Sequence, residues 1–209
     1  MLNTPVPVLI SRIVVLIVAF TVHEFAHAWT ANYFGDDTPR LQGRLTLNPL
    51  VHLDFLGSLL LLVAGFGWAK PVQVNPYALE QRSPSAPMLV ALAGPASNFM
   101  LALLAAAPVQ AGFLTPTLSA SGFLPSLGLL ISEFVSINLL LMLFNLIPVF
   151  PLDGEKVLTY FLPESGKNFM AMLRPYGQFI LIALIFLVPG VLQFLIGGPI
   201  QALYGLLLG

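Results

Sequence analysis

The sequence predicts an all-α polytopic membrane protein with about five to six transmembrane or re-entrant helices and a short β-hairpin. Hydrophobic residues make up 57% of the chain and charged residues only 8%, whereas soluble domains carry about 25% charged residues. The mean hydropathy is +0.91. Between Arg82 and Asp153 the only charged residue is Glu133, and no charged residue follows Arg174. Long uncharged stretches of this kind are typical of chains that cross the bilayer several times.

The first predicted span covers residues 7–33, because a helix needs about 20 apolar residues to cross the hydrocarbon core. Gly35-Asp36-Asp37 ends this span, and a polar stretch follows over 36–54. Residues 55–67 are apolar but too few for an upright span. They are therefore expected to form either a tilted short span or a re-entrant segment.

Residues 68–82 are expected to form the extended hairpin. Pro71 and Pro76 disfavour a helix, and Val72-Gln73-Val74 alternates between apolar and polar side chains, as a half-buried strand does. An exposed strand edge at this place could pair with the backbone of an extended peptide.

The second half of the chain contains further apolar segments. They cover 86–111, with an interruption at Gly94-Pro95, then 126–147, 169–188 and 191–208. Residues 112–125 are uncharged and rich in Gly, Pro and Ser, which is typical of a loop. We find no internal repeat and no room for a separate soluble domain. The chain is therefore interpreted as one membrane-embedded domain over 1–209, with a catalytic core at about 7–160 and C-terminal helices at about 169–208.

His23-Glu24-Phe25-Ala26-His27 lies within the first predicted span. Residues four apart share one face of a helix, so the two imidazoles can bind one metal ion while Glu24 reaches a metal-bound water. Ionisable groups at membrane depth are unfavourable and usually serve a function. The alternative is that His23 and His27 are hydrogen-bonded residues of a helix bundle and that Glu24 pairs with a basic group. The spacing favours a zinc hydrolase motif, which indicates hydrolysis inside the bilayer.

The motif needs a third ligand, because a catalytic zinc has three protein ligands and one open position. The chain has no cysteine, and His52 is the only other histidine, so carboxylates compete with His52 for this role. Asp153 follows a span and two prolines, Pro148 and Pro151, that discourage helix. Irregular backbone near membrane depth must face protein or a wet cavity, which suits a metal ligand. Asp153 could instead cap a helix that begins near Glu155.

These motifs together resemble the site-2 protease family of intramembrane zinc metalloproteases, in its compact prokaryotic form. The resemblance rests on the HExxH motif at 23–27, on Asn145-Leu146-Ile147-Pro148-Val149-Phe150-Pro151-Leu152-Asp153-Gly154, and on Gly94-Pro95-Ala96-Ser97-Asn98. It implies one zinc ion per chain, held by His23, His27 and Asp153, with Glu24 as the catalytic carboxylate. The PDZ-type insertion and CBS-type tail of other branches are absent from this sequence.

The resemblance implies an intramembrane endopeptidase that hydrolyses peptide bonds in transmembrane segments of other proteins. Asn98 and Asn145 each lie near a proline break and could bind substrate or stabilise the oxyanion. Hydrogen bonding between helices is the alternative for both, since Asn often does this in membranes. Val72, Gln73 and Val74 of the hairpin could face the substrate. The alternative function is a non-catalytic membrane protein that binds or transports zinc.

Basic residues indicate the orientation, because they favour the cytoplasmic side. They lie in 36–54, 68–85 and 154–175, whereas 112–125 has none. The active site is therefore expected nearer the cytoplasmic side of a prokaryotic cell membrane, although Arg12 near the outer end is an exception. The net charge of −1 gives no indication of nucleic-acid binding. The expected partners are the lipid bilayer and transmembrane substrates; the sequence leaves the oligomeric state open.

Overall fold

The computed structural model describes residues 4–54, 56–57, 67–120 and 122–209, and this part of the chain is all-helical. Its helices are α1 (Val6–Tyr33), α2 (Thr38–Leu41), α3 (Pro49–His52), α5 (Pro76–Arg82), α6 (Ala86–Gln110), α7 (Leu127–Asn145), α8 (Asp153–Phe161), α9 (Glu164–Leu173), η1 (Arg174–Tyr176), α10 (Gly177–Phe186), α11 (Pro189–Leu192), η2 (Gln193–Gly197) and α12 (Gly198–Leu208).

Five helical stretches of the described chain are long and apolar enough to cross a membrane. They are Val6–Tyr33, Ala86–Gln110, Leu127–Asn145, Glu164–Phe186 and Gly190–Leu208. The predicted all-α polytopic membrane fold is therefore confirmed, and the first three spans begin and end within two residues of the predicted limits.

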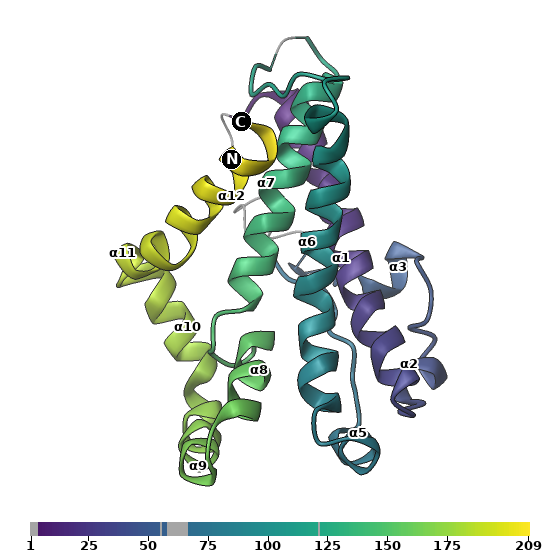
Figure 1. Cartoon of the computed structure of the whole chain (residues 1–209), viewed down its shortest axis with the longest axis vertical. Helices are drawn as coiled ribbons and strands as arrows, with labels where there is room; N and C mark the ends of the chain where they lie inside the picture. Colours follow the sequence, from purple (N-terminus) through teal and green to yellow (C-terminus); the bar gives the residue numbers. More distant parts are fainter. Residues whose placement is uncertain (1–3, 55, 58–66, 121) are drawn as a thin grey trace.

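Helices α1, α6 and α7 lie side by side and form the core of the molecule (Figure 1). Many of their buried residues are small, such as Ala28 and Ala31 of α1 and Ala91 and Ala102 of α6. Small residues let helix backbones approach closely, which is how helices associate where lipid removes the hydrophobic driving force. This close packing brings groups on α1 and α6 within reach of one another.

Helix α1 ends at a glycine cap. Gly35 has a φ of +86°, a conformation that side chains other than glycine rarely adopt. Its N–H donates to the Asn32 carbonyl and the N–H of Asp36 donates to the Ala31 carbonyl, each at 3.0 Å. This pair of bonds is the Schellman arrangement, which stops the helix and turns the chain. The turn sets the direction of the polar segment that follows.

Helix α6 is continuous through Gly94-Pro95, so the expected interruption there is wrong. Proline removes one helical hydrogen bond, but the neighbouring turns continue the helix. Ser97 Oγ donates to the Gly94 carbonyl at 2.7 Å, in the turn that contains the proline. Membrane helices tolerate proline where side chains of this kind bond to the backbone.

The predicted β-hairpin is also wrong for the described residues, which contain only an isolated antiparallel bridge between Leu53 and Ala69. Pro76 begins a helix instead of preventing one, because the first helical position needs no N–H donor. The Asn75 side chain caps this helix by accepting a hydrogen bond from the Ala78 N–H. Residues 55 and 58–66 lie outside the described residues, so the tilted or re-entrant segment stays a prediction.

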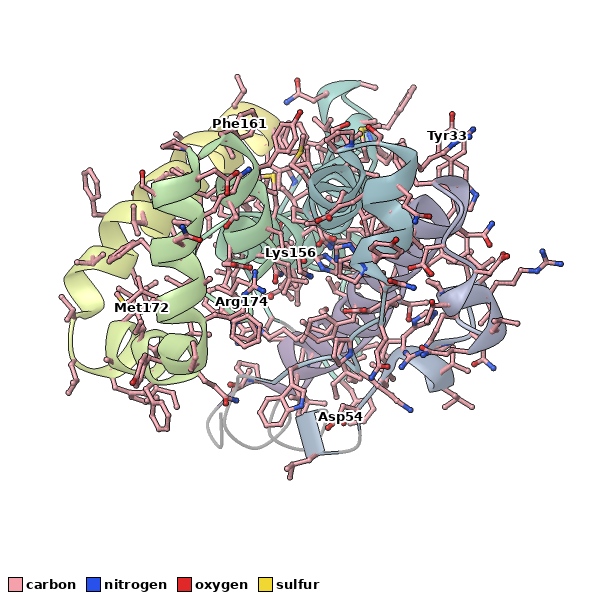
Figure 2. The ribbon with its side chains drawn as sticks, turned by 90° about the horizontal axis from the view of Figure 1, so that it is seen from below. Tyr33, Asp54, Lys156, Phe161, Met172 and Arg174 are labelled. Atoms are coloured by element: carbon pink, nitrogen blue, oxygen red, sulfur yellow. The ribbon has the colours of Figure 1, made fainter. Side chains whose placement is uncertain are left out.

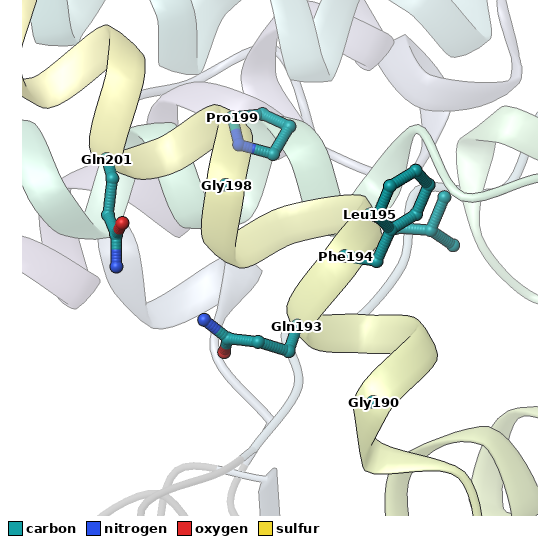
Figure 3. A pocket seen from close by; sticks show the side chains of 7 residues that line it. All are labelled: Gly190, Gln193, Phe194, Leu195, Gly198, Pro199 and Gln201. Carbon is teal, nitrogen blue, oxygen red and sulfur yellow. The ribbon is translucent and has the colours of Figure 1, made fainter.

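The C-terminal helices α9 to α12 follow one bent path, from the end of the molecule where α5 lies to the opposite end, where the C-terminus lies (Figure 1). The path bends at α11 and η2, beside an open pocket of about 690 Å³ (Figure 3). The pocket is lined by Gly190, Gln193, Phe194, Leu195, Gly198, Pro199 and Gln201. None of these residues belongs to the motifs that predicted a metal site.

Candidate metal centre

Three buried side chains meet at one point: His23, His27 and Asp153. The Nε2 atoms of the two histidines are 3.0 Å apart, and each lies 3.3 Å from Oδ2 of Asp153. The histidines occupy successive turns of α1, as a spacing of four residues predicts. Asp153 reaches them from the first turn of α8, directly after the irregular segment that contains Pro148 and Pro151. The structure thus brings together the three ligands expected from the sequence.

The separations of these atoms fit a tetrahedral zinc ion. Atoms bound at about 2.0–2.1 Å from such an ion lie about 3.3 Å from one another. The Nδ1–H of His27 donates to the Val90 carbonyl at 2.7 Å, so a neutral ring presents the lone pair of Nε2 to the other two atoms. Either a shared proton or a metal ion must therefore lie among the three atoms. Two imidazole nitrogens and one carboxylate oxygen are a donor set that zinc takes.

The Asp153 carboxyl is held in its ionised form. Burial by itself raises the pKa of this carboxyl, but when a proton is shared among the three groups, the charge of the His27 ring and the hydrogen bonds from His23 and His27 outweigh burial and keep the pKa below its ordinary value. The ionised carboxylate is the form that binds a metal.

Gly94 of α6 lies directly against the imidazole nitrogens. A Cβ atom at this position would lie 2.6 Å from Nε2 and Cε1 of His23 and would also collide with Nε2 of His27. Only glycine therefore lets α6 pass so close to the site. The sequence predicts a helix break at Gly94-Pro95, whereas the structure shows that Gly94 allows the close approach of α6 to the histidines.

Asn98 fixes the orientation of the His23 ring. Its Oδ1 accepts a hydrogen bond from Nδ1 of His23 at 2.7 Å, and its Nδ2 donates to Oδ1 of Asn138 at 3.0 Å and to the Ala19 carbonyl at 3.4 Å. Such partners orient histidine ligands in metal sites. Both amide hydrogens of Asn98 donate to groups on neighbouring helices. This favours a role in positioning the His23 ring over the oxyanion role expected for Asn98.

Glu24 is buried beside the metal site and accepts a hydrogen bond from the segment that follows the bridge between Leu53 and Ala69. The backbone N–H of Val72 donates to Oε2 of Glu24 at 2.8 Å. We call residues 69–75 the strap. Val72 and Val74 are half-buried and Gln73 is exposed, so the predicted alternation of side chains is present without a strand.

The polar segment between α1 and α3 anchors the strap at both ends. Asp36 Oδ2 accepts a hydrogen bond from the Asn75 N–H at 2.6 Å. Arg44 donates to the Lys70 carbonyl at 3.2 Å, and the Lys70 N–H donates to the His52 carbonyl at 2.8 Å. His52 is fully buried, and its Nε2 bonds to the Thr46 carbonyl at 2.7 Å, so it supports this segment and is not among the metal-site residues.

Helix α8, which carries Asp153, is anchored to the C-terminal helices. Arg174 donates to Oε1 of the buried Glu155 through Nη2 at 2.7 Å and Nε at 3.3 Å. Seen from below, Arg174 and Lys156 lie toward the middle of the molecule, whereas Tyr33 and Met172 lie at its rim (Figure 2). Removing Arg174 would leave the buried Glu155 carboxylate without its partner, so the pair holds α8 in place.

The other sequence candidate, Asn145, has a local partner. Asn145 donates to the Leu141 carbonyl at 2.9 Å, one turn before it on α7. Glu133 forms an ion pair with Arg12 at 3.0 Å, which joins α7 to α1. Asn138 is not among the residues predicted from the sequence, although its distance of seven residues from Asn145 places it on the same face of α7.

Comparison with known proteins gives one family match and several relatives. The model of the family described as "Peptidase family M50" matches residues 11–135. The chain is 41% identical over 191 residues to the "Putative zinc metalloprotease YwhC" of Bacillus subtilis, an alignment that covers 88% of this chain and 84% of that protein.

Two more distant relatives are named "Putative zinc metalloprotease Rip2". The chain is 32% identical to the protein of Mycolicibacterium smegmatis, with 81% of this chain and 64% of that protein covered. It is 31% identical to the protein of Mycobacterium tuberculosis strain H37Rv, with 82% and 63% covered. The chain thus spans less than two thirds of the length of these two relatives. No solved structure shows significant similarity.

Proposed function

Because this chain belongs to peptidase family M50, the site-2 protease family, we propose that it hydrolyses peptide bonds within transmembrane segments of other membrane proteins. The observation that carries the proposal is the cluster of His23, His27 and Asp153, because both histidines and the neighbouring Glu24 lie on α1, the longest apolar helix of the described residues. One zinc ion per chain is the proposed cofactor. The multi-pass chain would lie in a prokaryotic cell membrane, where its partners are lipid and transmembrane substrates.

Glu24 is the proposed catalytic carboxylate. A zinc ion held by His23, His27 and Asp153 would polarise a carbonyl group and lower the pKa of a water molecule. Glu24 is buried next to His23 in the chain, so its Oε2 can take up a proton and later deliver it to the leaving amine. The N–H of Val72 bonds to this same oxygen and leaves its second lone pair, and both lone pairs of Oε1, able to accept a proton.

The strap is the proposed substrate-facing element. A helical peptide bond is shielded by its own hydrogen bonds, so the substrate must unwind before hydrolysis. An unwound strand could pair with the backbone of Val72, Gln73 and Val74, as peptides pair with exposed sheet edges. The N–H of Val74 makes no hydrogen bond within the described part of the chain, which leaves it able to donate to a substrate.

The activity is tested with purified, zinc-loaded protein and single-span substrates in liposomes. We expect cleavage within the membrane segment of the substrate, located by mass spectrometry of both fragments. Cleavage confined to soluble tails, or abolished only by inhibitors of other proteases, would contradict the proposal.

The active site is proposed to lie nearer the cytoplasmic side. Trp29 and Tyr33 are exposed and stacked just beyond His27, and aromatic residues of this kind gather at membrane interfaces. The chain has no cysteine, so single-cysteine variants report single positions. In intact cells an impermeant reagent should label Ser119→Cys and leave Ser165→Cys unlabelled; equal labelling of the two would reject this orientation.

Val74→Pro is expected to retain zinc but to cleave a transmembrane substrate more slowly. Proline removes the N–H donor, and losing one backbone hydrogen bond of about 1 kcal/mol slows cleavage about fivefold. Initial rates at low substrate concentration measure the effect. Val74→Ala is the matched control, because it shortens the same side chain and keeps the N–H.

The substrate itself provides a second comparison. A substrate with helix-breaking residues near its cleavage site is already unwound, so Val74→Pro should slow its cleavage less. Equal rates for Val74→Pro and Val74→Ala on both substrates would reduce the strap to a connecting segment.

A further inference from the structure

A line of hydrogen bonds leads from the metal centre through three helices. Nδ1 of His23 on α1 bonds to Oδ1 of Asn98 on α6 at 2.7 Å, and Nδ2 of Asn98 donates to Oδ1 of Asn138 on α7 at 3.0 Å. Nδ2 of Asn138 then donates to the Phe134 carbonyl at 2.9 Å, one turn earlier on α7. Both asparagines are fully buried.

The direction of this line is determined by its last member. The Phe134 carbonyl can only accept, so Nδ2 of Asn138 must point to it and Oδ1 must point to Asn98. Oδ1 of Asn138 can only accept, so Asn98 must offer it Nδ2 and turn its own oxygen to His23. The Ala19 carbonyl, also an acceptor, supports the same orientation of Asn98 at 3.4 Å.

The orientation of Asn98 determines the state of His23. With the Asn98 oxygen facing Nδ1, the His23 ring carries its proton on Nδ1 and keeps the lone pair of Nε2 for a metal. If Asn98 were reversed, its Nδ2 would need Nδ1 of His23 as an acceptor, and the proton would move to Nε2. A protonated Nε2 cannot bind a metal.

Asn138 is the partner that makes the reversed state unfavourable. Without its oxygen, only the longer contact to the Ala19 carbonyl would oppose a reversal of the Asn98 amide. One buried amide hydrogen would also lose its partner, which is unfavourable in an apolar interior.

We propose that Asn138 is a positioning residue of the metal centre, which acts through Asn98 to keep Nε2 of His23 available to zinc. The inference rests on the proposed zinc site, but its test measures metal binding without any substrate. A chain that binds zinc as proposed and cleaves nothing would therefore contradict the proposed activity and leave this inference intact.

The test is a double-mutant cycle on zinc affinity, measured in detergent by competition with a chelating dye. Asn138→Leu and Asn98→Leu should each weaken zinc binding by about 10–100-fold, which is typical for partners of metal-bound histidines. The double variant should bind no more weakly than the weaker single variant, because both changes break one line of bonds. Ser132→Ala is the matched control: Ser132 is fully buried on α7, and its hydroxyl has no hydrogen-bond partner within the described residues.

Two results would overturn the inference. One is wild-type zinc affinity in Asn138→Leu. The other is a double variant whose loss of zinc-binding free energy equals the sum of the two single losses, because the effects of independent structural damage are additive. If Asn138→Leu does not fold, Asn138→Asp takes its place, since it keeps an oxygen facing Asn98. Asn138→Asp should bind zinc more tightly than Asn98→Leu, and an equal loss in the two variants would also reject the inference.

Discussion

Glu24→Gln is expected to bind zinc as the wild-type chain does and to cleave transmembrane substrates about 100- to 10,000-fold more slowly, the range that a general base contributes. Glutamine keeps the shape of the side chain, and its Oε1 can still accept the hydrogen bond from Val72 N–H that Glu24 accepts. The strap should therefore stay in place. What the amide loses is the ability to take up a proton.

The measurement pairs metal content with cleavage rate in the same preparation. Zinc at one equivalent per chain together with lost cleavage supports the assignment of Glu24. Glu164→Gln is the matched control, because Glu164 is a highly exposed glutamate outside the metal-site cluster. A Glu24→Gln variant that cleaves near the wild-type rate would show that the proton is handled by another group.

Asp153→Ala is expected to lose zinc. Removing the hydrogen-bond partner of a metal ligand lowers metal affinity about 10–100-fold, and removing the ligand itself should lower it more than about 100-fold. The variant would also leave two histidine nitrogens 3.0 Å apart without the carboxylate that faces both. Zinc content after dialysis against a weak chelator measures the loss. Glu155→Gln is the informative comparison, because this buried carboxyl lies two residues away and pairs with Arg174 instead.

The two variants distinguish a ligand from a neighbour. Glu155→Gln should loosen α8 and weaken zinc binding less than Asp153→Ala does. Full retention of zinc in Asp153→Ala would remove Asp153 from the site, and equal losses in the two variants would assign Asp153 a structural role only.

The sequence predicted the spans and the proposed ligands because both depend on local spacing. Apolar stretches of sufficient length identify membrane helices, and a spacing of four residues places His23 and His27 on one face. Asp153 could be singled out because two prolines lie just before it. These signals do not require knowledge of the three-dimensional packing.

The errors of the sequence analysis have a common physical origin. The usual effect of proline predicts that Pro76 and Pro95 interrupt helices, yet Pro76 begins a helix and Pro95 lies inside one. Whether a proline ends a helix depends on its position and on the groups around it. The close approach of Gly94 to the histidines depends on where α6 crosses α1, and the partnership of Asn98 with Asn138 depends on α7 as well.

The separation of the metal-site residues along the chain has a consequence for biosynthesis. His23 and His27 are made before α6 and α7, whereas Asp153 is made after both of these spans. A growing chain that has inserted only α1 thus carries Glu24 without a complete ligand set. Peptide-bond hydrolysis would have to wait until α7 and α8 have emerged and packed. The order of the residues would protect neighbouring nascent membrane proteins from an immature protease.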